Sequence, residues 1–250
     1  MNKIALVTGA SSGIGLEFAK ILAANDYDLI LVARNKSELD KVAKTLPTTT
    51  TTVAVDLSTK GSADHVWKYV KGDIDFVINN AGFGDLEDID KADWKKLEAM
   101  IDLNIETLTR LSQLASIKMK KQGSGHILNV ASTAAFAPGP RMATYYATKA
   151  YVLSFTEAIA EELKGTGVTV TALCPGPTQS NFAKQANASR SGIFSGKLPT
   201  AHDVALYGYL SAMKGKVVAV HGLKNKLSAL VLPRLVSRAL LRRAVERAQS

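Results

Sequence analysis

The sequence predicts an α/β fold: one domain built on a doubly wound, mostly parallel sheet of seven strands with helices on both faces. Apolar runs of strand length alternate along the chain with segments of helical spacing, which is the order of parallel α/β units. The first run is followed by a glycine-rich turn and a helical pattern. No linker or repeat divides the 250 residues, a length that suits one large core.

The predicted strands are apolar runs that end in polar or glycine residues. In chain order they cover residues 3–8, 27–33, 48–55, 74–79, 124–130, 168–173 and 216–220. The threonines that enter the third run are β-branched and favour a strand over disorder. Helical spacing predicts helices from residue 13, over 36–46, over 94–121 and up to residue 164. In such a sheet, ligands bind at the carboxyl ends of the strands.

The turn after the first strand carries Gly9, Gly13 and Gly15, spaced G-x-x-x-G-x-G and not G-x-G-x-x-G. Bare Cα atoms let a pyrophosphate approach the backbone, and the N-terminus of the following helix attracts its charge. A plain helix-start turn would carry glycines in the same way.

The end of the second strand indicates which dinucleotide would bind. Where an acid would hold the ribose hydroxyl of NAD, the chain has Ala33 followed by Arg34. An arginine pairs with a 2′-phosphate that an acid would repel. Ser11 and Asn35 are further donors. Some NADP-binding proteins carry a basic residue in the glycine turn, where this chain has Ser11 and Ser12. We therefore expect NADP(H) to be preferred over NAD(H).

A tyrosine and a lysine four residues apart, Tyr145 and Lys149, follow a serine, Ser132, at the end of the fifth strand. On a helix this spacing places both side chains on one face. The hydroxyl of Ser132 could polarise a carbonyl while Tyr145 delivers a proton. A nearby cation would lower the tyrosine pKa from its usual value of about 10. Tyrosine and lysine at this spacing also occur on ordinary surface helices.

Composition excludes several classes of protein. The single cysteine, Cys174, rules out an intrachain disulfide, and the four histidines lack ligand spacing, so we expect no metal site. No apolar run approaches the length of a membrane span, and the N-terminus does not resemble a signal peptide. These features indicate a soluble, cytoplasmic protein. Residues 178–200 are irregular and polar and could form a substrate lid or a plain surface loop.

Several motifs together carry a resemblance to a known family. They are Thr8-Gly9-x-x-x-Gly13-x-Gly15, Asn79-Asn80-Ala81-Gly82, Asn104, Ser132, Tyr145-x-x-x-Lys149 and Pro175-Gly176. In this order they resemble the short-chain dehydrogenase/reductase family, in its single-domain Rossmann-like branch, and are similar to hydroxysteroid and 3-oxoacyl reductases. The resemblance implies a catalytic domain over residues 1–222. The chain departs from many compact members of the family in the residues that follow, 223–250, which we expect to form a basic helical extension of the same domain.

The resemblance also implies roles for four catalytic residues. Tyr145 would be the general acid/base, Ser132 would bind the substrate oxygen, and Asn104 would anchor a water in a proton relay. Lys149 would hold the nicotinamide ribose and lower the tyrosine pKa. Tyr146 is a rival to Tyr145, but no lysine follows it at the same spacing.

A larger set would bind the cofactor through the turns at the strand ends. It comprises Gly9, Ser11, Ser12, Gly13, Ile14, Gly15, Arg34, Asn35, Asp56, Leu57, Asn80, Ala81, Gly82, Tyr145, Lys149, Pro175, Gly176 and Thr178.

The function implied is NADP(H)-dependent hydride transfer between the nicotinamide and a ketone or secondary alcohol, and we expect this small-molecule substrate to be apolar. The family's enzymes lead us to expect a homodimer or homotetramer. A redox-sensing protein that binds NADP(H) without turnover is the alternative, which the intact catalytic set disfavours. A nucleotide-sugar epimerase is disfavoured by the glycine spacing and the lack of a large C-terminal substrate domain.

The C-terminal segment carries most of the net charge of +9, because nine basic residues from Lys214 onward face a single acid. We expect Pro233 to begin a last helix with one cationic stripe and one apolar stripe. The stripes are Arg234, Arg238 and Arg242, and Val236, Leu240 and Ala244. This helix could pack on the body or a second subunit, or dock on an acidic carrier or an anionic membrane surface. No base-reading motif accompanies the charge, so we expect no nucleic-acid binding.

Overall fold

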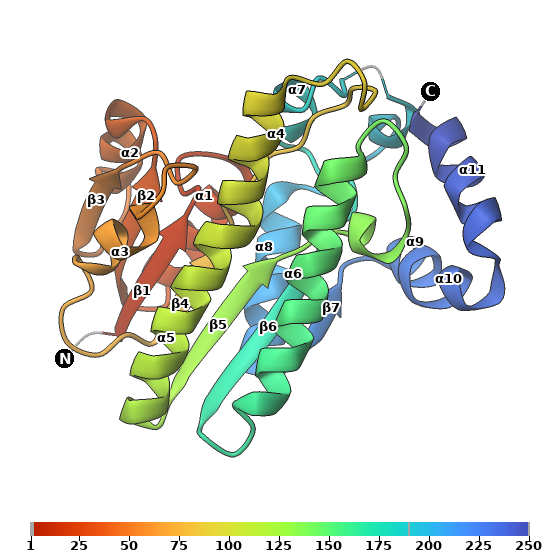
Figure 1. Ribbon diagram of the computed structural model, residues 1–250. Helices are drawn as coiled ribbons and strands as arrows, with labels where there is room; N and C mark the ends of the chain where they lie inside the picture. Colours follow the sequence, from red (N-terminus) through yellow and green to blue (C-terminus); the bar gives the residue numbers. More distant parts are fainter. Residues whose placement is uncertain (1–2, 190, 250) are drawn as a thin grey trace.

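Seven parallel strands form the centre of the structure, a computed structural model that describes residues 3–189 and 191–249, and helices cover both faces of the sheet (Figure 1). Across the sheet the strands are β3 (Thr50–Ala54), β2 (Tyr27–Ala33), β1 (Lys3–Thr8), β4 (Phe76–Asn79), β5 (Gly125–Val130), β6 (Val168–Cys174) and β7 (Val218–Val220). Every neighbouring pair is parallel. The predicted fold class is therefore confirmed, with a sheet that is parallel throughout.

The strand order reverses at β1, which pairs with β2 on one side and β4 on the other. This is the topological switch point at which open α/β sheets bind ligands. The central strands are buried on both faces, which explains why they appear in the sequence as continuous apolar runs.

Helices pack on the two faces of the sheet and build two cores. Before the C-terminal segment, the α-helices of six or more residues are α1 (Gly13–Ala23), α2 (Lys36–Ala43), α3 (Ser62–Trp67), α4 (Trp94–Ile101), α5 (Leu108–Gln122), α6 (Ala143–Glu162) and α8 (Ala201–Met213). Residues of α1 and α8 pack in one core, and residues of α3, α5 and the end of α6 pack in the other. Figure 1 shows α5 and α6 in front of the sheet and α8 behind it.

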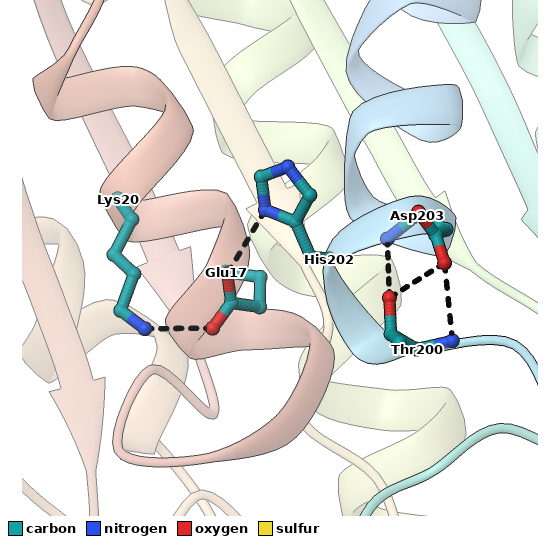
Figure 2. Close-up of polar contacts among 5 residues, drawn as sticks. All are labelled: Glu17, Lys20, Thr200, His202 and Asp203. Atoms are coloured by element: carbon teal, nitrogen blue, oxygen red, sulfur yellow. Dashed lines mark hydrogen bonds and ion pairs between the residues drawn. The ribbon is translucent and has the colours of Figure 1, made fainter.

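The contact between α1 and α8 includes an exposed polar cluster (Figure 2). Glu17 accepts hydrogen bonds from Lys20, at 2.8 Å, and from His202, at 3.1 Å when Nδ1 carries the proton. Burial raises the pKa of Glu17, but these hydrogen bonds outweigh it and the net shift is downward. Thr200 and Asp203 form a reciprocal capping box that fixes the start of α8.

The predicted helix over 94–121 is present but contains an irregularity. A π-helical turn, η1 (Asp102–Thr107), separates α4 from α5. Asn104 lies within it, and its amide donates to the carbonyl of Phe83 at 3.0 Å and to Thr148 Oγ1 at 3.1 Å. π-Bulges of this kind occur frequently at functional sites.

The segment 178–200 contains two short helical turns, α7 (Phe182–Gln185) and η3 (Gly192–Phe194). A further turn, η2 (Thr133–Phe136), follows β5. Within the described ranges, no helix is long and apolar enough to cross a bilayer.

The C-terminal segment consists of α9 (Leu223–Lys226), the π-helical turn η4 (Leu227–Val231), α10 (Leu232–Leu235) and α11 (Arg238–Gln249). The expectation that Pro233 begins the last helix is wrong. Pro233 lies at the start of the one-turn helix α10, and the extended backbone of Val236 ends that helix before α11 begins. The predicted cationic stripe is therefore interrupted between Arg234 and Arg238.

The predicted apolar stripe of α11 is also wrong, by one position. Leu240 is 55% exposed, whereas Leu241 and Gln249 are buried and Val245 is half-buried between them. The helix turns this neighbouring face inward because its last turn packs against the segment 178–200, where Ala248 lies beside Gly192.

Candidate active site

A cleft of ≈ 950 Å³ opens at the carboxyl ends of the strands. Most of the residues selected from the sequence line it. They are Gly9, Ser11, Ser12, Gly13, Ile14, Arg34, Asn35, Asp56, Leu57, Asn80, Ala81, Gly82, Ser132, Tyr145, Lys149, Pro175, Gly176 and Thr178. Two selected residues, Gly15 and Asn104, lie behind the wall of the cleft.

The glycine turn brings backbone against backbone. Gly9 has φ +66°, and a Cβ on Gly15 would lie 2.3 Å from the carbonyl oxygen of Gly9. Gly15 therefore serves the packing of α1 on β1. Asn80 holds this turn to β4, because its side chain donates to the carbonyls of Thr8, at 2.9 Å, and Gly9, at 3.3 Å.

The N-terminus of α1 faces the cleft with its amides available. Ser12 occupies the N-cap position but makes no side-chain capping hydrogen bond. Uncapped amides at a helix N-terminus favour an anion, and the side-chain-free turn at Gly9 and Gly13 leaves room for it. The residues present therefore fit the pyrophosphate of a dinucleotide.

The opposite flank of this part of the cleft carries Arg34, which is exposed at the end of β2. Asn35 beside it caps α2, because its side chain accepts a hydrogen bond from the amide of Glu38. Burial raises the pKa of Asp56, but hydrogen bonds from Ser58 and the charge of Arg34 lower it overall.

Three lining residues on α2, Glu38, Lys41 and Val42, were missed from the sequence. Lys41 adds a second cation near Arg34. The signal that could have found it is its position on the helix that follows this strand, next to the buried Val42.

Three of the predicted catalytic residues meet at the other end of the cleft. Ser132 follows β5, and its Oγ donates to the carbonyl of Pro175 at 3.4 Å and accepts from the amide of Ala134 at 3.1 Å. Tyr145 and Lys149 lie one turn apart on α6. Lys149 Nζ is 5.9 Å from the centre of the Tyr145 ring and donates to the carbonyl of Val130 at 2.7 Å.

Burial dominates the electrostatics of this end. It lowers the pKa of Lys149 to about 8. It raises the pKa of Tyr145 well above its usual value, although a hydrogen bond with Ser132 acts against it. This arrangement gives the opposite of the shift expected from the Tyr145–Lys149 spacing, because removal of water from the phenol outweighs the lysine.

Asn104 reaches the site through Gly82. A Cβ on Gly82 would lie 3.0 Å from Asn104 Oδ1 and 3.4 Å from Lys149 Nζ. The absence of a side chain on Gly82 therefore lets both polar groups lie close to its backbone. Asn104 does not line the cleft and supports it from the π-helical turn.

Tyr146, set aside as a rival to Tyr145, also lines the cleft. Its hydroxyl accepts a hydrogen bond from Gln249 Nε2 at 3.1 Å, which ties the last turn of α11 to the cleft wall. Burial raises the pKa of Tyr146, and the contact with Gln249 acts against this shift. Nothing in the local sequence pairs these residues, which lie 103 positions apart.

Aromatic residues from the segment 178–200 form the apolar part of this end. The Phe182 ring lies 5.3 Å from that of Tyr145, and Phe194 lies 6.3 Å from Phe182. Met142 packs in the same cluster. This wall suits an apolar group next to the reactive hydroxyls.

Behind the site, a buried polar network connects the strands to the helices, and of its members only Asn79 was selected from the sequence. Asn79 donates to Asn129 Oδ1 at 2.8 Å and to Ser112 Oγ at 3.0 Å, and Asn129 donates to Thr156 Oγ1 at 3.0 Å. Hydrogen-bonded buried polar groups of this kind fix the relative positions of the elements that carry them. Here those elements are β4, β5, α5 and α6.

Comparisons with known proteins agree with this geometry. Residues 3–191 match the family model of the short chain dehydrogenases. An uncharacterized oxidoreductase of Staphylococcus epidermidis is 39% identical over 178 residues, which cover 70% of this chain and 77% of the relative.

Two solved structures extend the similarity. A short-chain dehydrogenase from Sphingobium yanoikuyae in complex with NADPH has a TM-score of 0.81 at 28% identity, covering 88% of each chain. A 7β-hydroxysteroid dehydrogenase has a TM-score of 0.86 at 25% identity and covers 98% of this chain and 99% of its own. The chain belongs to the short-chain dehydrogenase/reductase family and is an oxidoreductase.

Proposed function

We propose that this protein is an NADP(H)-dependent oxidoreductase that interconverts a ketone and a secondary alcohol with an apolar body. The observation that carries the proposal is the arrangement of the cleft. An uncapped helix N-terminus and Arg34 lie at one end, and Ser132, Tyr145 and Lys149 converge at the other.

Reduction of a carbonyl consumes one hydride, which a bound nicotinamide supplies to the carbonyl carbon, and one proton, which goes to the oxygen. In the proposed mechanism the Ser132 hydroxyl donates a hydrogen bond to the carbonyl oxygen. Tyr145 then delivers its phenolic proton to that oxygen and is reprotonated from solvent. Because burial raises the tyrosine pKa, the phenol stays protonated at neutral pH, as a proton donor must.

Lys149 and Asn104 support this proton transfer in the proposal. Lys149 holds the nicotinamide ribose, and its positive charge stabilises the phenolate that Tyr145 becomes. Asn104 anchors a water in the path that reprotonates the tyrosine. The close approach of both Asn104 Oδ1 and Lys149 Nζ to the Gly82 backbone supports this path.

The preference for NADP(H) is proposed because two cations, Arg34 and Lys41, line the cleft in the segment that follows β2. A phosphate–arginine contact is charge-assisted and bidentate, whereas the 2′-hydroxyl of NAD would gain little from it. The NADPH bound to the Sphingobium yanoikuyae enzyme supports the same preference here.

An apolar, bulky substrate is proposed from the wall of Phe182, Phe194 and Met142. The likeness to a 7β-hydroxysteroid dehydrogenase, which extends over the C-terminal segment, supports a substrate of this class.

We also propose that the enzyme assembles as a homodimer or homotetramer. Exposed apolar residues on the outer face of α4 to α6, Ile101, Ile117 and Tyr151, support an interface there. Light scattering of the purified protein would measure the assembly.

The test is turnover of NADPH by the purified protein with a panel of cyclic, aromatic and steroid ketones, followed by NADPH absorbance. We expect Tyr145→Phe to bind NADPH, measured by its fluorescence, but to lose activity by roughly 10²–10⁴-fold. Tyr146→Phe is the matched control and should retain the chemical step. NADPH binding with no turnover of any ketone would instead favour the redox-sensing alternative.

A further inference from the structure

The helical segment from α9 to α10, residues 223–235, turns apolar side chains toward solvent. The exposed ones are Leu223 (83%), Leu227 (56%), Val231 (41%), Leu232 (40%) and Leu235 (78%), which we call the outward stripe. Four of them recur at every fourth residue, so they follow one face of the segment. A surface helix normally turns such a face to the core.

The inner face of the segment is anchored, which fixes the stripe in its outward orientation. Ala229 is buried in a small core with β6 and β7. The Asn225 side chain donates to the carbonyl of His221 at 2.8 Å and fills the space over Gly176, where a Cβ would lie 2.5 Å from Asn225 Nδ2. The leucines are therefore held outward by packing behind them.

Cations lie within the outward stripe's segment and in the helix α11 that follows it. They include Lys224, Arg234, Arg238, Arg242, Arg243 and Arg247. Within residues 3–189 and 191–249, the ion pairs do not involve Lys224, Arg234 or Arg238. Exposed leucines among such cations combine the two attractions that bind a protein to an anionic bilayer surface: apolar burial and charge.

We propose that the outward stripe docks the protein on an anionic lipid surface. A second copy of the chain fits less well, because a two-fold contact through this patch would bring its cations against each other. Lipid acyl chains accept side chains that project as far as Leu223 and Leu235, and anionic headgroups complement the positive charge of the segment and of α11.

The position of the patch connects docking to the cleft. The turn η4 lies against η2, which follows Ser132, and α11 lies against η3 in the segment that borders the cleft. Figure 1 shows α9, α10 and α11 together at one side of the molecule, beyond β7. A bilayer on this side would adjoin the cleft and supply apolar substrates to it. The docking itself goes beyond the proposed function and requires no turnover.

The experiment is flotation of the full-length protein with vesicles of phosphatidylcholine alone, or of two parts phosphatidylcholine to one part anionic phosphatidylglycerol. We expect flotation only with the anionic vesicles. High salt should weaken it, because the distance over which exposed charges attract each other, about 8 Å at physiological ionic strength, becomes shorter as salt is added. The substitutions Leu223→Gln, Leu227→Gln and Leu235→Gln, made together, should reduce vesicle affinity by about 10²-fold or more. These side chains are exposed, so the variant should fold, which circular dichroism would verify.

A second variant separates the two attractions. Replacing Lys224, Arg234 and Arg238 by Gln should reduce binding about five-fold for each charge removed. The matched control is Ile89→Gln, an equally exposed apolar residue (66%) outside the stripe, which should float like the wild type.

Absence of flotation with anionic vesicles would overturn the proposal, as would equal flotation of the leucine variant and the wild type. If the wild type does not float and light scattering shows that the leucine variant loses an oligomer, the stripe is an interface between copies. NADPH turnover by the leucine variant in vesicle-free buffer separates a failure of docking from a failure of the proposed function.

Discussion

Burial of Lys149 makes the stability of the protein depend on pH in a way that can be measured. Its pKa is lowered from 10.5 to about 8 in the folded protein, because burial penalises the charged form. Between these values the unfolded chain binds the proton and the folded chain does not, so the free energy of unfolding rises with pH. Below the pKa of Lys149 in the folded protein, burial of its charged form costs the full penalty in unfolding free energy. Above its pKa in the unfolded chain, this penalty is gone.

The size of the effect follows from the shift. At about pH 7 the penalty is on the order of 3 kcal/mol, and at about pH 10 less than about 1 kcal/mol remains. Lys149→Met removes the charge and keeps much of the side-chain volume. The difference in unfolding free energy between the wild type and Lys149→Met should therefore change by roughly 2–3 kcal/mol over this range.

The assay is urea denaturation of both proteins, without cofactor, at a series of pH values. Buried tyrosines act in the opposite direction at higher pH: burial raises the pKa of Tyr27 to about 12, so stability falls above the unfolded tyrosine value. This contribution is common to both proteins and cancels in the difference. A difference that stays constant over the range would refute the reasoning and mean that Lys149 is solvated or paired.

Three further predictions follow from single contacts. Arg34→Ala should weaken NADPH binding roughly 10- to 100-fold and leave NADH binding nearly unchanged, and equal losses for both in titrations would contradict the proposed preference. Gly82→Ala places a Cβ 3.0 Å from the buried Asn104 Oδ1 and 3.4 Å from Lys149 Nζ, so one of these groups must shift; kcat should fall about ten-fold with a small loss of thermal stability, and an unchanged kcat would show that their positions are not used. Gln249→Ala frees the Tyr146 hydroxyl and should raise KM for bulky ketones about ten-fold with little change in kcat, whereas equal losses for small and bulky ketones would indicate general unfolding of α11.

Most regular elements could be predicted from the sequence because their signals are local. The runs at 3–8 and 27–33 are the strands β1 and β2 as predicted, and α1 begins at Gly13. Apolar periodicity and glycine position are properties of a few adjacent residues, which do not depend on the rest of the chain. The predicted third, fourth and seventh strands are shorter in the structure, although residues at their ends, such as Asp75 and Val217, still hydrogen-bond to neighbouring strands.

The site was predictable as a set of positions because parallel strands all end at one edge. Eighteen of the selected residues line a single cleft for this reason. Gly15 does not line the cleft because it lies at the contact between α1 and β1. Asn104 does not line it because it is buried in the π-helical turn η1.

Tertiary structure alone decided what depends on burial and on distant partners. The face that α11 turns inward is set by its contact with the segment 178–200, so helical periodicity chose the wrong residues. The contact of Tyr146 with Gln249 joins opposite ends of the second half of the chain. The sequence by itself determined the fold class and the family's motifs, whereas the raised pKa of Tyr145 arises only when the folded chain removes water from around the phenol.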